Sequence, residues 1–228
     1  LISGDTYLDT SYNGSALVGK WLVEHGFKVG IIAQPEVDVP DDITRLGEPN
    51  LFFAISGGCV DSMVANYTAT KKRRQQDDFT PGGENNKRPD RAVLVYSNMI
   101  RRFFKGTTKK IVISGIESSL RRITHYDYWT NKLRKPILFD AKADILSYGM
   151  GEMSMLQLAN ALKNGEDWRN IRGLCYLSKE PKEDYLSLPS HADCLADKDK
   201  FIEAFHTFYL NCDPITAKGL CQKCDDRY

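Results

Sequence analysis

Four short apolar runs of this chain end on small residues, and three of them are followed within a few positions by an acid. The four endings are Gly4-Asp5, Ser56-Gly57-Gly58, Gly115-Ile116-Glu117 and Gly149-Met150-Gly151-Glu152. Parallel strands finish along one edge of a sheet, so we expect these residues to line one crevice. Glycine lets a ligand approach the backbone closely, and the amino ends of the following helices favour anions. The sequence therefore predicts a binding edge, although a glycine in any single strand-to-helix turn is common and needs no ligand to explain it.

A second group of reactive side chains lies between the third and fourth runs. Arg121 and Arg122 can bind a phosphate or carboxylate through their guanidinium groups, or one of them can pair with Glu117 or Asp127 to fix the loop. His125, Tyr126 and Asp127 offer a titratable imidazole, a stacking surface and a carboxylate. Alternating aromatic residues also pack well as a buried loop. We therefore take these residues as contacts for a substrate or ligand and assign no catalytic residue.

The sequence words that are typical of nucleotide and metal sites are absent. None of the four endings is a G-x-G-x-x-G, the phosphate-loop lysine pattern is missing, and no histidine pair has metal-ligand spacing. Cys221 and Cys224, with Cys212 nearby, could supply half of a zinc site or ligands of a cluster, but a structural zinc ion needs four ligands and these cysteines do not follow the spacing of a cluster motif. We expect no metal in this chain, and the sequence leaves the role of these three thiols open.

The charge of the chain is unevenly distributed. The formal net charge is +1, yet residues 71–135 hold 17 Lys and Arg against 6 Asp and Glu, and the remainder holds 14 against 24. A positive middle segment favours an anionic partner such as a phosphate, RNA or an acidic protein surface. The alternative interpretation is that these basic loops are solvated and bind no partner.

Strand and helix patterns alternate along most of the chain. Strands are expected at 1–4, 28–33, 51–56, 111–114, 136–140, 143–148 and 171–177, and helices at 13–25, 60–70, 90–104, 153–162 and 201–210. The polar stretch 71–89 is longer than an ordinary connection, which marks it as functional or disordered. The alternation predicts an α/β fold, with an open, mostly parallel sheet covered by helices on both faces.

Several long sequence motifs of this chain resemble those of one protein family. GIESSLRRITHYDYW at 115–129 and YGMGE at 148–152 are similar to runs of the YgiQ-like radical SAM proteins. GFKVGIIAQP at 26–35, RPDRA at 88–92 and Asp213-Pro214 follow that family's pattern in the same order, so the resemblance covers the whole chain.

The resemblance implies a parent enzyme that binds a [4Fe–4S] cluster and S-adenosylmethionine. The family holds its cluster through three cysteines spaced C-x3-C-x2-C, and this chain has no such triplet. It therefore resembles the amino-terminal domain that precedes the radical SAM core, excised from a longer polypeptide and inactive by itself. The implied fold is Rossmann-like and similar to cobalamin-binding domains. Cobalamin is an alternative ligand, although the D-x-H-x-x-G word of one cobalamin class is missing.

These inferences define the expected organisation. We expect an α/β accessory domain over residues 1–177 and a helical tail or linker over 178–228, directed toward the core of the same polypeptide. The substrate stays unnamed, and an RNA- or polyanion-binding module using residues 71–135 is the alternative function. The chain has no secretory signal and no apolar run of about 18 residues, which predicts a cytoplasmic protein without a membrane segment.

Overall fold

A computed structural model describes residues 1–6 and 14–228 of the chain. The chain forms two compact units. The first consists of Leu1–Arg122 and Ile137–Tyr176, and the second of Ile123–Pro136 and Leu177–Tyr228. The second unit thus contains an internal segment as well as the chain after Tyr176. The division of function between 1–177 and 178–228 stays a prediction.

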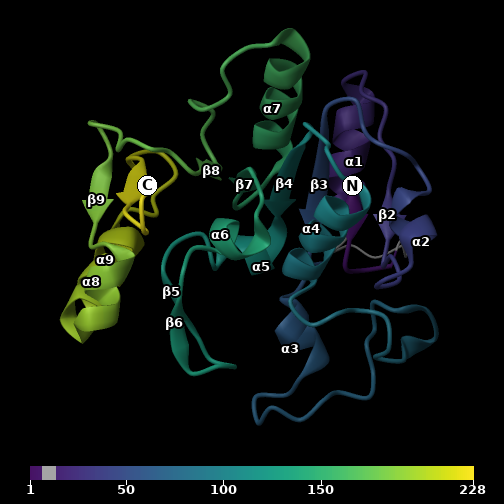
Figure 1. Cartoon of the computed structure of the whole chain (residues 1–228), viewed down its shortest axis with the longest axis horizontal. Coiled ribbons are helices and arrows are strands. Elements are labelled where there is room, and N and C mark those ends of the chain that lie inside the picture. Colours follow the sequence, from purple (N-terminus) through teal and green to yellow (C-terminus); the bar gives the residue numbers. More distant parts are fainter. Residues whose placement is uncertain (7–13) are drawn as a thin grey trace. The chain divides into compact units, whose positions relative to one another are not determined.

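A six-stranded sheet forms the centre of the first unit, with strand order β2-β1-β3-β4-β7-β8 (Figure 1). Its strands are β1 (Ile2–Ser3), β2 (Ile32–Ala33), β3 (Phe52–Ser56), β4 (Lys110–Ser114), β7 (Ile145–Ser147) and β8 (Leu174–Tyr176). Neighbours pair in parallel from β2 to β7, whereas β8 pairs antiparallel with β7. The prediction of an open, mostly parallel sheet is therefore confirmed.

Both faces of this sheet are buried beneath helices. One face is covered by α1 (Gly14–Glu24) and α7 (Glu152–Asn164), and the other by α2 (Pro40–Thr44), α4 (Ala92–Phe103) and α6 (Ile137–Ala141). Successive strand residues point to opposite faces, so Ile113 packs in the α4 core while Val112 packs in the α7 core. This two-sided burial explains why the strands read as continuous apolar runs. The predicted start of the first helix, at Asn13, lies outside the described residues.

The prediction of a strand at 136–140 is wrong, because this segment is the helix α6. Ile137, Leu138 and Ala141 are its buried residues, a spacing that fits one turn of helix. Lys142 follows with a φ of 50°, which turns the chain before β7 begins. A five-residue apolar run does not distinguish a strand from a buried helical turn, and here the packing against α4 decides.

The long segment after α3 (Ser62–Asn66) is held by its own hydrogen bonds. Isolated bridges pair Tyr67 with Arg73 and Gln76 with Glu84, and a short 3-10 turn covers Pro81–Gly83. The backbone N–H of Thr6 donates to the carbonyl of Phe79 at 2.9 Å, which joins the segment to the end of β1. The stretch predicted as functional or disordered is therefore an ordered loop in this structure.

The second unit combines two short sheets with two helices. The hairpin strands β5 (His125–Asp127) and β6 (Lys132–Arg134) are antiparallel, and β9 (Leu186–Leu188) and β10 (Leu220–Gln222) are parallel. The helices are α8 (His191–Ala196) and α9 (Lys198–Leu210). The expected helix at 201–210 is present within α9. The sequence did not predict α8, although Ser190 and Asp193 form a capping box at its start.

Within the described parts of the chain, no helix has the length and apolarity needed to cross a membrane.

Replacing Gly4 by alanine is expected to destabilise the first unit. A Cβ at this position would lie 2.1 Å from the carbonyl oxygen of Gly57, where the ends of β1 and β3 approach each other. The contacted carbonyl belongs to the backbone and the Cβ is fixed directly to it, so no flexible side chain can move to relieve the clash. We expect the free energy of unfolding to fall by about 3 kcal/mol. Urea denaturation measures the change. Gly14→Ala is the matched control, since a Cβ there meets nothing within 4 Å. Equal stabilities of the two variants would contradict the close approach.

Candidate functional site

The four predicted strand endings lie along one edge of the sheet. Ser3 is in register with Ser56, and Ser56 is in register with Ser114. Ile113 pairs with Leu146, so Ser147 continues this row on β7. The residues that follow each strand therefore emerge side by side, as expected for the carboxyl ends of parallel strands.

A hollow of about 170 Å³ opens at this edge, between the starts of α1 and α7. It is lined by five of the predicted residues, namely Ser56, Gly115, Gly149, Gly151 and Glu152. The endings of β3, β4 and β7, which are spread over residues 56–152 of the sequence, thus meet in one place. Leu17, Val18 and Met155 give the hollow an apolar wall.

Sequence reasoning missed Ser114 and the α1 residues Gly14 and Ser15, which also line this hollow. One signal could have found Ser114. Three strands end in the same Ile-Ser-Gly word, at Ile2, Ile55 and Ile113, and β7 ends in a similar Leu-Ser-Tyr-Gly word. The α1 residues carry no comparable signal, because only the packing of α1 beside α7 brings them to the edge.

Asp5 lies in a buried ion cluster with Arg88 and Asp77. A terminal nitrogen of the Arg88 guanidinium is 2.6 Å from the Asp5 carboxylate, and its Nε is 3.2 Å from Asp77. The same guanidinium donates to the carbonyl of Gly57 at 2.8 Å. The other Asp5 oxygen accepts from the backbone N–H of Cys59 at 2.6 Å. The Asp5 carboxylate is thus occupied by internal partners, and its role in ligand binding stays a prediction.

Gly58 is needed for this cluster to close, and Gly57 leaves room for Glu117. A Cβ on Gly58 would lie 2.2 Å from the Asp5 carboxylate and 2.4 Å from Arg88, and its φ of 115° disfavours other residues. A Cβ on Gly57 would lie 2.5 Å from the Glu117 carboxylate. The packing around these two positions therefore explains why they are glycines. Their predicted contact with a ligand stays a prediction.

Glu117 joins two helices inside the first unit. Its carboxylate accepts from the backbone N–H of Ser62 at 3.0 Å and from that of Val93 at 3.2 Å, so it serves the starts of α3 and α4. The residue belongs to α5 (Gly115–Ser119) and is only 3% exposed. Burial, followed by the nearby charge of Asp61, raises the pKa of the Glu117 carboxyl above its ordinary value.

The two arginines after α5 have separate partners. Arg121 forms an ion pair with Asp61 and donates to the carbonyl of Glu117 at 3.0 Å. The Arg122 guanidinium lies over the Tyr148 ring, 4.6 Å from its centroid. Pairing of one arginine with an acid was one of the two predicted alternatives, but the partner is Asp61 and neither of the acids closest to it in sequence. Their binding of an anion stays a prediction.

His125, Tyr126 and Asp127 belong to the second unit, where they form β5. The Tyr126 hydroxyl donates to the side chain of Asn131 at 2.6 Å. Buried Asp127 accepts from the hydroxyl of Thr130 at 2.5 Å, which stabilises the turn between β5 and β6. The three residues build one strand of a hairpin, and their contact with a substrate or ligand stays a prediction.

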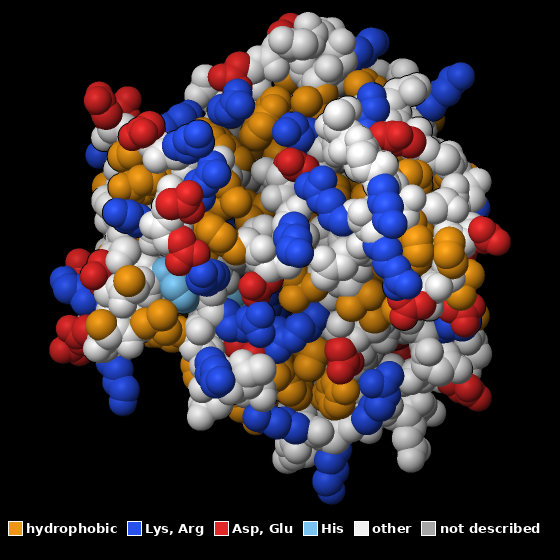
Figure 2. All heavy atoms as spheres, viewed as in Figure 1, with side chains coloured by type: hydrophobic (Ala, Val, Ile, Leu, Met, Phe, Trp, Pro, Cys, Tyr) orange, Lys and Arg blue, Asp and Glu red, His pale blue; other side chains and the backbone are white. Residues whose placement is uncertain are grey.

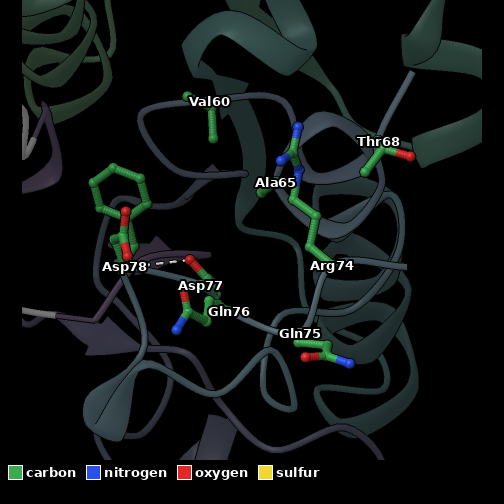
Figure 3. A pocket seen from close by; sticks show the side chains of 9 residues that line it. Val60, Ala65, Thr68, Arg74, Gln75, Gln76, Asp77 and Asp78 are labelled. Atoms are coloured by element: carbon green, nitrogen blue, oxygen red, sulfur yellow. Dashed lines mark hydrogen bonds between the residues drawn. The ribbon is translucent and has the colours of Figure 1, made fainter. Parts of the chain in front are cut away.

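A larger hollow of about 660 Å³ lies on the ordered loop of the first unit. Figure 3 shows Arg74 on one side of it and Gln76 and Asp78 on another. The Arg74 Nε donates to the carbonyls of Val64 and Tyr67, both at 3.1 Å, so this arginine helps to shape the loop. Most of the lining residues, 74–79, belong to the stretch 71–89 that its length marks as functional or disordered, although no motif predicts a hollow there.

The family model described as "Radical SAM N-terminal" matches residues 1–228. The chain belongs to the radical SAM N-terminal family. The resemblance seen in the sequence words is thereby confirmed.

Relatives of this radical SAM N-terminal chain are considerably longer than the chain itself. A UPF0313 protein of Fusobacterium nucleatum is 96% identical over 228 residues, which cover 100% of this chain and 40% of that protein. A UPF0313 protein of Thermotoga neapolitana is 48% identical over 231 residues, again 100% of this chain and 40% of that protein. The chain spans about two fifths of the length of these relatives.

A solved structure shares the fold of this radical SAM N-terminal chain. It is the radical S-adenosylmethionine methyltransferase TsrM from Kitasatospora setae, with cobalamin and a [4Fe–4S] cluster bound. The TM-score is 0.50 at 16% identity, over 77% of this chain and 26% of that chain. This likeness agrees with the Rossmann-like, cobalamin-binding-domain-like class predicted from the sequence.

The residues of this chain do not fit an iron–sulfur cluster. The C-x3-C-x2-C word is absent from the sequence. Among the residues that the structure describes, no three His, Cys, Asp or Glu side chains gather as a metal site. Cys224 is buried and Cys212 is exposed, and neither belongs to such a group.

Replacing Arg88 by methionine is expected to destabilise the protein strongly. The guanidinium is fully buried, so its removal leaves the carboxylates of Asp5 and Asp77 without their cation. Breaking a buried ion pair in this way costs about 3–5 kcal/mol. Urea denaturation at pH 7 measures the loss.

Arg73→Met is the matched control for that experiment. Arg73 lies 3.7 Å from Asp90 and about half of its side chain is exposed, so the pair is screened by solvent. We expect its loss to change stability by less than about 1 kcal/mol. Similar effects of both substitutions would show that the buried cluster does not hold the strand endings.

Proposed function

We propose that this chain is the accessory amino-terminal domain of a radical SAM iron–sulfur enzyme and that it presents its strand-ending edge to the ligand of that enzyme. The observation that supports this proposal is the hollow lined by Ser56, Gly115, Gly149, Gly151 and Glu152. Open α/β sheets bind ligands outside the carboxyl ends of their strands.

The lining of the hollow indicates what it would hold. Leu17, Val18 and Met155 suit an apolar group, while Ser56 and Glu152 can accept hydrogen bonds from a donor or a cation. Its volume of about 170 Å³ is smaller than the roughly 300–1,000 Å³ of common ligand pockets. The hollow therefore suits one limb of a ligand whose remainder contacts another part of the enzyme.

Exposed methionines beside the hollow fit a surface that meets another domain. Met150 is 87% exposed and Met153 is 56% exposed, and both lie at the start of α7. Methionine is flexible and polarizable, so it adapts to a partner surface. The proposed partner is the radical SAM core, which would bind S-adenosylmethionine and the cluster whose C-x3-C-x2-C motif is absent from this sequence.

Cobalamin is a second candidate ligand, favoured by the shared fold with the cobalamin-bound TsrM structure. The hollow is too small for the whole cofactor and would take only a limb of it. A Cβ on Gly151 would meet Ser147 and Met155 only at ordinary contact distance, so a larger side chain can be introduced there without a backbone clash.

The RNA-binding alternative stays a prediction from charge alone. Figure 2 shows Lys and Arg side chains spread over the viewed face with Asp and Glu among them. Within the basic segment, Arg88, Arg101 and Arg121 each pair with a carboxylate. These pairs reduce the positive field that a polyanion would meet.

Iron content tests the accessory-domain proposal. After anaerobic reconstitution with iron and sulfide, the full-length protein is expected to be brown and to retain iron. The 228-residue chain alone is expected to stay colourless, because it lacks the cysteine triplet. Absorption spectra and iron analysis after gel filtration provide the measurement. A full-length protein without bound iron would remove the enzyme proposal.

Cobalamin binding is tested on the same full-length protein. After incubation with hydroxocobalamin, visible absorbance is expected to elute with the protein. Gly151→Leu should lower the retained amount because the new side chain would fill the hollow, whose wall Gly151 forms. Lys20→Leu is the control, since Lys20 is exposed on α1 and does not line the hollow. If the unaltered protein retains no cobalamin, this candidate is rejected while the iron result stands by itself.

A further inference from the structure

The outer side of α9 in the second unit carries a stripe of large apolar side chains. Ile202, Phe205 and Tyr209 are 51%, 52% and 65% exposed. Their spacing of three and then four residues places them on one side of the helix. The opposite side contains Ala204, which is buried, where α9 packs against α8 and β9. The helix therefore has an apolar side in addition to the one that it uses within its own unit.

The two aromatic rings of this stripe already contact each other. The centroids of Phe205 and Tyr209 are 6.0 Å apart and their planes differ by 18°, a stacked arrangement. Single exposed apolar residues are ordinary on protein surfaces, but a contiguous row of three marks an interaction site. Aromatic side chains contribute much of the binding energy at such sites because they bury a large area.

Two observations indicate what covers the stripe. The chain spans 40% of the length of relatives that match it throughout, and its family is that of an amino-terminal region. Tyr228 belongs to the same unit as α9, where its backbone N–H and C=O bond to Ser178 at 2.9 and 2.8 Å. The polypeptide that follows in the longer relatives therefore leaves from the unit that carries the stripe.

We infer that Ile202, Phe205 and Tyr209 form a docking surface for the remaining part of the same polypeptide. This inference rests on the proposed function, in which this chain is the amino-terminal domain of a longer radical SAM enzyme. Basic Lys198 lies one turn before Ile202 on the same side of the helix, and acidic Asp199 is next to it in sequence. The occupant should therefore present an apolar groove with charges of both signs at its rim, as in the binding of a helix to a groove.

Site-specific crosslinking in the full-length protein tests this inference. Phe205 is replaced by the photoreactive p-benzoylphenylalanine, which keeps an aromatic ring at an exposed position and so should not disturb folding. After irradiation and digestion, mass spectrometry is expected to find the α9 peptide joined to a peptide outside residues 1–228, in a species of monomer mass. Glu203, exposed on another side of α9, carries the same probe as the control and should give no such product.

Three results would overturn the docking surface. They are a crosslink to residues 1–176, which means that the first unit covers the stripe; a product of twice the monomer mass, which means a second copy; and no product above the level seen with Glu203. Iron analysis of the same samples separates this inference from the proposed function. Iron-loaded protein without the expected crosslink overturns the docking surface alone, and a crosslinked protein without iron overturns the enzyme proposal alone.

Discussion

The burial of one guanidinium, that of Arg88, determines how the strand endings of the first unit are arranged. A charge in a protein interior is costly unless it is paired and hydrogen-bonded, and Arg88 meets this condition through Asp5, Asp77 and the carbonyl of Gly57. These partners come from the end of β1, from the long loop and from the end of β3. The loop is therefore closed around the sheet edge by a charge, and the hollow remains on the side of α1 and α7.

Glu117 has a similar effect on the neighbouring strand. It follows β4 and accepts from the N–H groups that begin α3 and α4, which fixes two helices with one carboxylate. Together with the Arg88 cluster, it explains why the motifs after β1 and β4 contain both a glycine and an acid, and why the motif after β3 contains two glycines. The glycines leave space for neighbouring side chains, and the acids bind Arg88 and the starts of α3 and α4. A glycine and acid motif that predicts a ligand site can thus also hold elements of the fold together.

The sequence was sufficient to predict the class of fold and the edge on which the hollow lies. The strands at Phe52–Ser56 and Lys110–Ser114 read correctly because burial on both faces gives continuous apolar runs. The segment Ile137–Ala141 was misread because one helical turn and a short strand show the same apolar residues. The partners of Asp5 and Glu117 could not be predicted, since they come from positions 24 to 83 residues away that only the folded sheet brings near. Arg121 and His125 were read as one group because they are close in sequence, whereas the chain divides them between the two units.

The order of residues in the Arg88 cluster has a consequence for how the protein is made. Asp5, Gly57 and Asp77 all precede Arg88 in the sequence. Because a nascent chain emerges with its amino end first, each acceptor has left the ribosome before the guanidinium appears. Both carboxylates that pair with Arg88 are therefore already synthesised when its guanidinium appears. The segment that encloses it can settle as soon as β1 and β3 have paired, while the residues of β7 and α7 are still being translated.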